Sequence, residues 1–186
     1  MGMKPGTTLV VGVGNTLRGD DGVGQEVAEM LWLQRDRQAG LQDASFIFAQ
    51  QLTPDLALEL SQAGFAVFID SSVQGCPGSV RLSPLSPEAQ EGGGHDTQAT
   101  GAGCWRDPSP EGLLRLARSL YGSSCPAVLV SVSVASMALG DELSPLVRAA
   151  VPVAAAAACV AIEEHRSSPD GPARTGGKGG GAAYCA

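Results

Sequence analysis

Short apolar runs alternate along the chain with segments whose apolar residues recur every three or four positions. The run FAVFI at 65–69 is continuous and apolar, as expected of a central parallel strand. The segment PEGLLRLARSLY at 110–121 has the spacing of an amphipathic helix, and Gly122 follows where such a helix ends. This alternation is typical of α/β proteins. We therefore predict an α/β fold with three layers (αβα): a twisted, mostly parallel sheet with helices on both faces.

The same two patterns predict the other elements. Further strands are expected at 7–13, 45–49, 79–85 (a weak edge strand) and 127–134, and further helices at 21–35, 54–63 and 144–164. The polar, Gly-rich stretch 86–108 predicts a long loop. The composition of 167–186, rich in Gly, Ser, Pro and Ala, predicts a disordered tail. We expect one α/β domain over 1–166, followed by this tail.

Composition narrows the possible functions. The chain has 186 residues and a formal net charge of −7, which argues against nucleic-acid binding because that needs clustered Lys and Arg. The N-terminus lacks a signal-peptide pattern, and the longest apolar stretch, 151–162, is too short to span a membrane. The five cysteines have no paired spacing, so a disulfide framework is not expected. We expect a soluble, cytoplasmic monomer without nucleic-acid or membrane partners.

Acidic residues follow two of the predicted strands. Asp20 and Asp21 come after the first strand, just before a helix, and Asp70 ends the run FAVFI. Because sites in open α/β sheets form outside the carboxyl ends of the strands, these carboxylates could converge on one crevice. Joined by an imidazole, they would suit nickel or zinc. The alternative is structural: Asp20 or Asp21 as a helix N-cap, and Asp70 as the cap of a turn.

Other chemistries have less support. Gly12 and Gly14 follow a strand, but Leu17 stands where a dinucleotide-binding motif needs its third glycine. The glycines are better explained by a tight turn and a close backbone approach. A serine nucleophile is disfavoured because the G-x-S-x-G motif is absent. A nucleotide-binding α/β enzyme nevertheless stays an alternative.

Two histidines are available. His165 ends the last helix and is expected to be solvated or to interact with the helix dipole. His95, in the Gly-rich loop, is the imidazole that could join Asp21 and Asp70. Cys104, beside Trp105, is more easily explained as a structural thiol than as a nucleophile.

Four stretches of the sequence resemble the maturation endopeptidases of [NiFe] hydrogenases. They are LVVGVGNTLRGDDGVG at 9–24, QQLTPDLALELSQAGFAVFIDSSVQGCPGSVRL at 50–82, PEGLLRLARSLYG at 110–122 and LVSVSVASMALGDELSP at 129–145. They occur in the order and at the spacing of that family, over roughly residues 8–163. The first motif is quite specific, and the series of four is more specific than any single part.

The resemblance implies a single α/β domain that removes a short C-terminal extension from the hydrogenase large-subunit precursor after nickel insertion. In such proteins an acidic residue of the first motif, an Asp after the third strand and a His bind the metal. Carried onto this chain, Asp21 and Asp70 are the implied metal ligands and catalytic residues, with His95 as third ligand. We also expect Gly14 and Asn15 to contact substrate. The nickel is expected to arrive with the precursor, although another divalent metal is possible.

The chain departs from the family pattern at the third ligand. The family His lies a few residues before the 110–121 helix, but the sequence there is GCWRDP at 103–108. Either an insertion lets His95 fold back, or the His is lost and Cys104 substitutes. No side chain is an evident nucleophile, so we expect the metal to polarise a water or the scissile carbonyl, with Asp21 or Asp70 as ligand or base. The alternative function is a non-catalytic chaperone that checks the metal of the immature large subunit.

Overall fold

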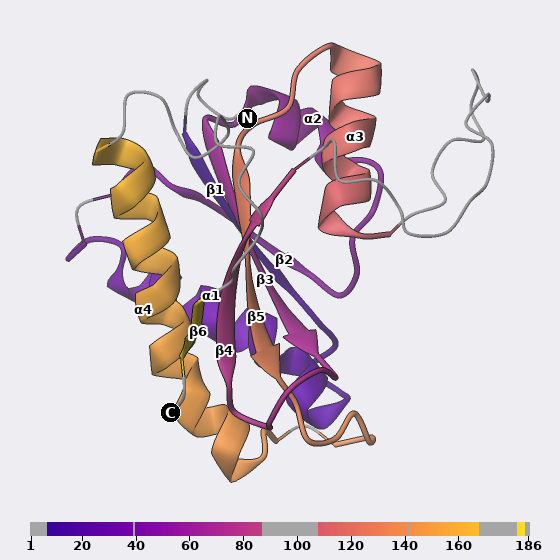
Figure 1. The fold of residues 1–186 in the computed structure, drawn as a ribbon, viewed down its shortest axis with the longest axis vertical. Coiled ribbons are helices and arrows are strands. Elements are labelled where there is room, and N and C mark those ends of the chain that lie inside the picture. Colours follow the sequence, from indigo (N-terminus) through magenta and orange to yellow (C-terminus); the bar gives the residue numbers. More distant parts are fainter. Residues whose placement is uncertain (1–6, 39, 87–107, 141, 168–181, 185–186) are drawn as a thin grey trace.

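The computed structural model describes residues 7–38, 40–86, 108–140, 142–167 and 182–184. Figure 1 shows a twisted sheet between two layers of helices. The strands are β1 (Thr8–Val13), β2 (Ser45–Ala49), β3 (Phe65–Ser72), β4 (Val80–Leu85), β5 (Ala127–Ser133) and β6 (Ala182–Tyr184). The helices are the short 3-10 helix η1 (Gly19–Gly22), α1 (Val23–Gln34), α2 (Leu56–Gln62), α3 (Pro110–Tyr121) and α4 (Pro145–Ser167). The predicted αβα fold is confirmed.

The sheet has the strand order β2-β1-β3-β5-β4-β6. Strands β2, β1, β3 and β5 are parallel, whereas β4 runs antiparallel to β5 and β6 antiparallel to β4. The carboxyl ends of the four parallel strands therefore meet at one edge of the sheet. In an α/β sheet this is the edge at which ligands bind.

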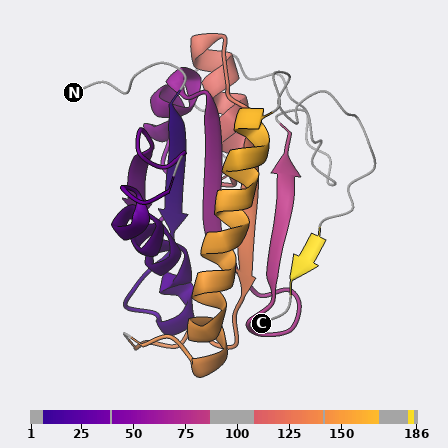
Figure 2. The same ribbon diagram turned by 90° about the vertical axis from the view of Figure 1, so that its left-hand side faces the viewer.

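Each face of the sheet carries its own apolar core. Helices α1 and α4 cover one face, where Leu31 and Val151 pack against strand residues such as Val67. Helices α2 and α3 cover the other, where Leu60 and Leu114 pack with Phe68. Figure 2 shows α4 lying along the near face of the sheet. The alternation of Val67 and Phe68 between the two faces explains why β3 is apolar throughout, since both of its faces are buried.

Helix α4 has 23 residues and is long and apolar enough, by length and composition, to cross a membrane. It extends beyond the 144–164 segment expected from the sequence, and beyond the apolar stretch 151–162. Its residues from Val147 to Ile162 that face the sheet are buried in the core. A core helix of this kind passes the same length and composition test, so α4 is weak evidence for a membrane span.

Two element boundaries differ from the prediction. Helix α2 begins at Leu56 rather than Pro54, because Thr53 and Pro54 belong to a turn in which their carbonyls accept from the amides of Leu56 and Ala57. Strand β3 continues to Ser72, because the partner strand β5 extends far enough to pair Asp70 with Ser131 and Ser72 with Ser133. Asp70 therefore lies within a strand rather than at its end.

The prediction of a disordered tail over 167–186 is wrong at Ala182–Tyr184. These residues form β6, antiparallel to β4, with Arg81 opposite Ala183. Pairing needs only backbone groups, and the outer edge of β4 offers a row of them whatever the composition of the incoming segment. Residues 168–181 and 185–186, like most of the predicted loop 86–108, lie outside the described residues.

Asp20 is buried, with 2% of its surface exposed, and does not cap α1 as one of the structural alternatives supposed. The N-cap residue of α1 is Gly22, and no side chain caps it. The Asp20 carboxylate instead accepts hydrogen bonds from the β5–α4 connection (residues 134–144). The donors are the amides of Ala135 (3.1 Å), Ser136 (3.3 Å) and Ser144 (2.6 Å) and the Ser144 hydroxyl (3.0 Å). Asp20 lies in the 3-10 helix η1, directly before α1, and from there its carboxylate reaches the connection.

The Asp20 carboxylate should make stability depend on pH. Burial alone would raise its pKa, but the hydrogen bonds from Ser144, Ala135 and Ser136 lower that pKa below the ordinary value. Because the pKa of Asp20 is lower in the folded than in the unfolded state, its carboxylate contributes fully to stability at a pH above the unfolded-state pKa. This contribution is lost as the pH falls through the folded-state pKa.

We predict that Asp20→Ala lowers the free energy of unfolding at pH 7 by about 3 kcal/mol, because it leaves several donors without a charged acceptor. Urea denaturation at pH 7 and in the acid range measures both effects. The loss of stability at acid pH should be smaller in Asp20→Asn than in the wild type. Asp43→Asn, at an exposed position, is the control and should stay within about 0.5 kcal/mol of wild type. An Asp20→Ala variant as stable as this control would contradict the assigned role.

Candidate active site

Asp21 lies in η1, in the turn between β1 and α1. The chain reaches this position through Gly14, whose φ of 142° is unfavourable for other residues. A Cβ atom on Gly14 would also collide with the carbonyl oxygen of Asp21. The next residue, Asn15, donates its backbone amide to Asp21 Oδ2 at 3.2 Å. The expected tight turn with a close backbone approach is thus present and holds the Asp21 side chain in place.

Asp70 lies in β3 near the carboxyl end of the strand. Its Oδ1 accepts a hydrogen bond of 2.7 Å from the backbone amide of Ser71. Burial raises the pKa of Asp70 to about 6; the Ser71 amide opposes this shift, and the nearby charge of Asp21 adds to it. At neutral pH the group is therefore mostly ionised, yet it is a stronger base than an exposed aspartate.

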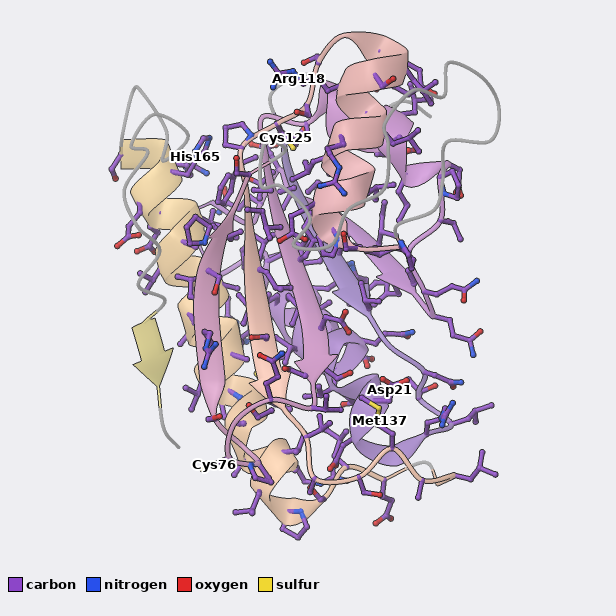
Figure 3. All side chains as sticks on the ribbon, turned by 45° about the vertical axis from the view of Figure 1, so that its right-hand side comes forward. Asp21, Cys76, Arg118, Cys125, Met137 and His165 are labelled. Atoms are coloured by element: carbon purple, nitrogen blue, oxygen red, sulfur yellow. The ribbon has the colours of Figure 1, made fainter. Side chains whose placement is uncertain are left out.

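Ser71 connects the two predicted carboxylates. Its hydroxyl donates to Asp21 Oδ1 at 2.9 Å, while its backbone amide donates to Asp70. The structure thus brings Asp21 and Asp70 to the same edge of the sheet, as predicted, although Asp20, their neighbour in sequence, is directed elsewhere. Figure 3 shows Asp21 far from His165. The link through Ser71 was not predicted, and the only signal for it is its position directly after Asp70.

A polar groove of about 260 Å³ opens beside Asp70, over strands β3, β5 and β4. Its lining includes Ser71, Ser131 and Arg81. A second, larger hollow of about 340 Å³ lies between α1 and β2 and is lined by Gln25, Trp32 and Phe48, among others. Neither Asp21 nor Asp70 lines the second hollow. The groove at Asp70 is therefore the better candidate for the place where chemistry occurs.

The third expected metal ligand, His95, and its substitute Cys104 lie outside the described residues. His165 is at the far end of the sheet, where its ring stacks on Phe65 with ring centres 4.2 Å apart. Burial lowers the pKa of His165. This position fits a partly buried packing role rather than the solvated one expected, and it excludes His165 from the site around Asp21.

Two of the described cysteines, Cys125 and Cys159, do not supply a nucleophile to this site. Cys76, Cys125 and Cys159 are free thiols. Burial raises the pKa of Cys125 to about 12, and burial with the charge of Glu163 raises that of Cys159. These two thiols therefore stay protonated at neutral pH.

A metal would find two carboxylates here. Each Asp21 oxygen accepts one hydrogen bond, and a carboxylate oxygen keeps a further lone pair for a cation. No group of three His, Cys, Asp or Glu able to hold a metal occurs among the described residues. The described residues thus offer a metal two carboxylates, and any further ligand would come from outside them.

The fold is that of the hydrogenase maturation endopeptidases. The hydrogenase maturating endopeptidase HybD from E. coli is 20% identical, with a TM-score of 0.63 over 85% of this chain and 93% of that one. The hydrogenase 2 maturation peptidase from Thaumarchaeota archaeon SCGC_AB-539-E09 is 25% identical, with a TM-score of 0.56 over 84% and 97%. An Escherichia coli endopeptidase solved in solution is 22% identical, with a TM-score of 0.61 over 87% and 94%.

No protein-family model and no curated protein sequence matches the chain. The resemblance seen in the four sequence stretches is nevertheless confirmed by these structures, which cover most of this chain and nearly all of their own.

The carboxylate pair predicts a specific titration. Asp70 should titrate near pH 6, and Asp21→Asn should lower that pKa because it removes a neighbouring negative charge. Burial is the larger cause and persists in the variant, so the pKa should stay above the ordinary value. The carboxyl carbon shift of Asp70, followed by NMR against pH, measures this. The control Asp43→Asn should leave the titration unchanged, whereas an Asp70 that titrates near pH 4 in the wild type would contradict the description.

Proposed function

We propose that the chain is an endopeptidase that removes the C-terminal extension of a [NiFe] hydrogenase large-subunit precursor after nickel insertion. The observation that carries this proposal is the pair Asp21 and Asp70, joined by Ser71 at the carboxyl edge of the sheet. The fold shared with proteins named hydrogenase maturation endopeptidases supports the choice of substrate.

The proposed reaction is hydrolysis of one peptide bond. A water adds to the scissile carbonyl carbon, and the leaving amine takes up a proton as the C–N bond breaks. Asp70, ionised and a stronger base than usual, accepts the proton of that water. Asp21 lies close enough for its charge to raise the pKa of Asp70. Asn15 and Ser71 hold its carboxylate in a fixed orientation, which lowers the entropy cost of bringing the reacting groups together.

Nickel enters this proposal as part of the substrate. The precursor brings the ion in its nascent metal site, and Asp21 and Asp70 supply oxygen ligands to it, with His95 or Cys104 as further ligand. The ion would polarise the scissile carbonyl or the water. Cleavage would then report that the precursor has been loaded.

The partner and setting are part of the proposal. The precursor is the protein partner, and Gly14 and Asn15, beside Asp21, are proposed to contact it. The enzyme would act as a soluble, cytoplasmic monomer, in keeping with its net charge of −7 and with the packing of α4 in the core.

We predict that Asp70→Asn lowers the rate of precursor processing by at least about 100-fold, because the amide can neither accept the proton nor act as an anionic ligand. Intact-mass measurement of the precursor over time follows the reaction. Asp43→Asn, at an exposed position away from the groove, should process at the wild-type rate. Normal processing by Asp70→Asn would disprove the role proposed for this residue.

The third ligand is tested separately. If His95 completes the metal site, His95→Ala should lose processing while Cys104→Ala keeps it, and the reverse pattern would assign the ligand to Cys104. The same mass measurement decides between them. Survival of processing in both variants would mean that neither residue is needed as a ligand.

The second candidate function is a non-catalytic chaperone for the same precursor. The sequence GCWRDP at 103–108, which lacks the family histidine, favours it. A complex between the chain and the nickel-loaded precursor, with no change in precursor mass, would support the chaperone and contradict the endopeptidase.

A further inference from the structure

One row of residues crosses three strands at the level of Asp70. In the sheet register Asp70 of β3 is opposite Ser131 of β5, and Ser131 is opposite Arg81 of β4. All three residues line the groove beside the site. Residues opposite one another in a sheet point to the same face, and neighbouring strands are about 4.8 Å apart. The Cα atoms of Asp70 and Arg81 are therefore about 10 Å apart, and both side chains are on one face of the sheet.

The floor between these two charged residues is mostly polar. Ser72, Ser83, Ser131 and the buried Ser133 line it, together with the apolar residues Leu129 and Val80. The serines and Leu129 share the face that α2 and α3 cover further along the strands, where Ala66 and Phe68 of β3 are buried in the core. The groove thus begins where the helical cover ends. A groove of about 260 Å³ is large enough for a few residues of an extended peptide.

The side chain of Arg81 is exposed and makes no ion pair or hydrogen bond with any residue that the structure describes. Its position is notable because the chain as a whole is acidic, with 19 Asp and Glu against 12 Lys and Arg. Ser133, by comparison, already donates to the carbonyl of Gln74 and accepts from Ser79. A guanidinium in a polar groove matches a carboxylate, which it can bind through two parallel hydrogen bonds.

We propose that Arg81 is a substrate-binding residue that holds a carboxylate of the substrate peptide about three residues from the scissile bond. The number of residues follows from the distance between Asp70 and Arg81, about 10 Å, because an extended peptide rises about 3.3 Å per residue. The carboxylate is that of an acidic side chain near the cleavage site. This inference rests on the proposed function, since it places the scissile bond at Asp70.

The first test is processing of the nickel-loaded precursor by wild type, Arg81→Gln and Arg81→Lys. We expect Arg81→Gln to raise KM about 10-fold or more with a smaller effect on kcat, because the lost contact is remote from the reacting bond. Arg81→Lys should fall between, since it keeps the charge but loses the two-pronged geometry. Arg37→Gln, which removes another exposed arginine outside the groove, should match the wild type.

The second test measures binding without cleavage. A labelled peptide spanning the cleavage site is titrated by fluorescence anisotropy against wild type and Arg81→Gln. Each acidic side chain of the peptide is replaced in turn by its amide, and the C-terminus is amidated in a further peptide. One of the side-chain changes should weaken wild-type binding about 10-fold and have no further effect in Arg81→Gln. The affected position identifies the source of the carboxylate.

The two tests separate the inference from the proposed function. Precursor left uncut by the wild type would overturn the proposed function, whereas the binding cycle would still decide the role of Arg81. Equal peptide binding by wild type and Arg81→Gln, or no coupling between Arg81 and any acidic side chain of the peptide, would overturn the inference even if processing is normal. Thermal unfolding of Arg81→Gln at the wild-type temperature would exclude misfolding as the cause of weaker binding.

Discussion

The hydrogen bonds of Asp20 hold the site together, although Asp20 does not belong to it. Its buried carboxylate accepts from Ala135, Ser136 and Ser144, so the β1–α1 turn is tied to the connection that leads from β5 into α4. Asp21 follows Asp20 directly and has little freedom once its neighbour is held. The position of Asp21 against Ser71 therefore depends on a contact made more than a hundred residues away in the chain.

Much of the fold could be predicted because its elements are local in origin. The apolar run of β3 and the periodic segment of α3 each specify their own conformation. Gly122 marks the end of α3 as expected. The convergence of Asp21 and Asp70 was also predictable, since both follow parallel strands that end at one edge. What these cases share is that no knowledge of strand register is needed.

The missed features depend on contacts that no local pattern records. Asp20 precedes a helix in the sequence, and this position suggested a helix cap. Its actual partners are amides of a distant connection, which the local sequence does not indicate. The row from Asp70 through Ser131 to Arg81 exists only because β4 returns antiparallel beside β5. The strand at Ala182–Tyr184 forms through backbone pairing to β4, which a composition rich in glycine conceals. The end of β3 was predicted too early, at Asp70, because pairing with β5 extends the strand to Ser72.

In the proposed mechanism both carboxylates hold the cation, and Asp70 also accepts a proton. Asp70, partly buried and with a raised pKa, suits proton transfer, whereas Asp21 is fixed by hydrogen bonds from Asn15 and Ser71 and suits ligation. The spacing of the strands sets the Cα atom of Arg81 about 10 Å from that of Asp70. A site of this kind would read an extended peptide and a bound cation at once.

The most direct test of this account compares the intact masses of nickel-loaded and nickel-free precursor after incubation with the wild-type protein. The account predicts that the loaded precursor loses one discrete C-terminal peptide while the nickel-free precursor keeps its mass. A loaded precursor that binds the protein and yet keeps its full mass would contradict it.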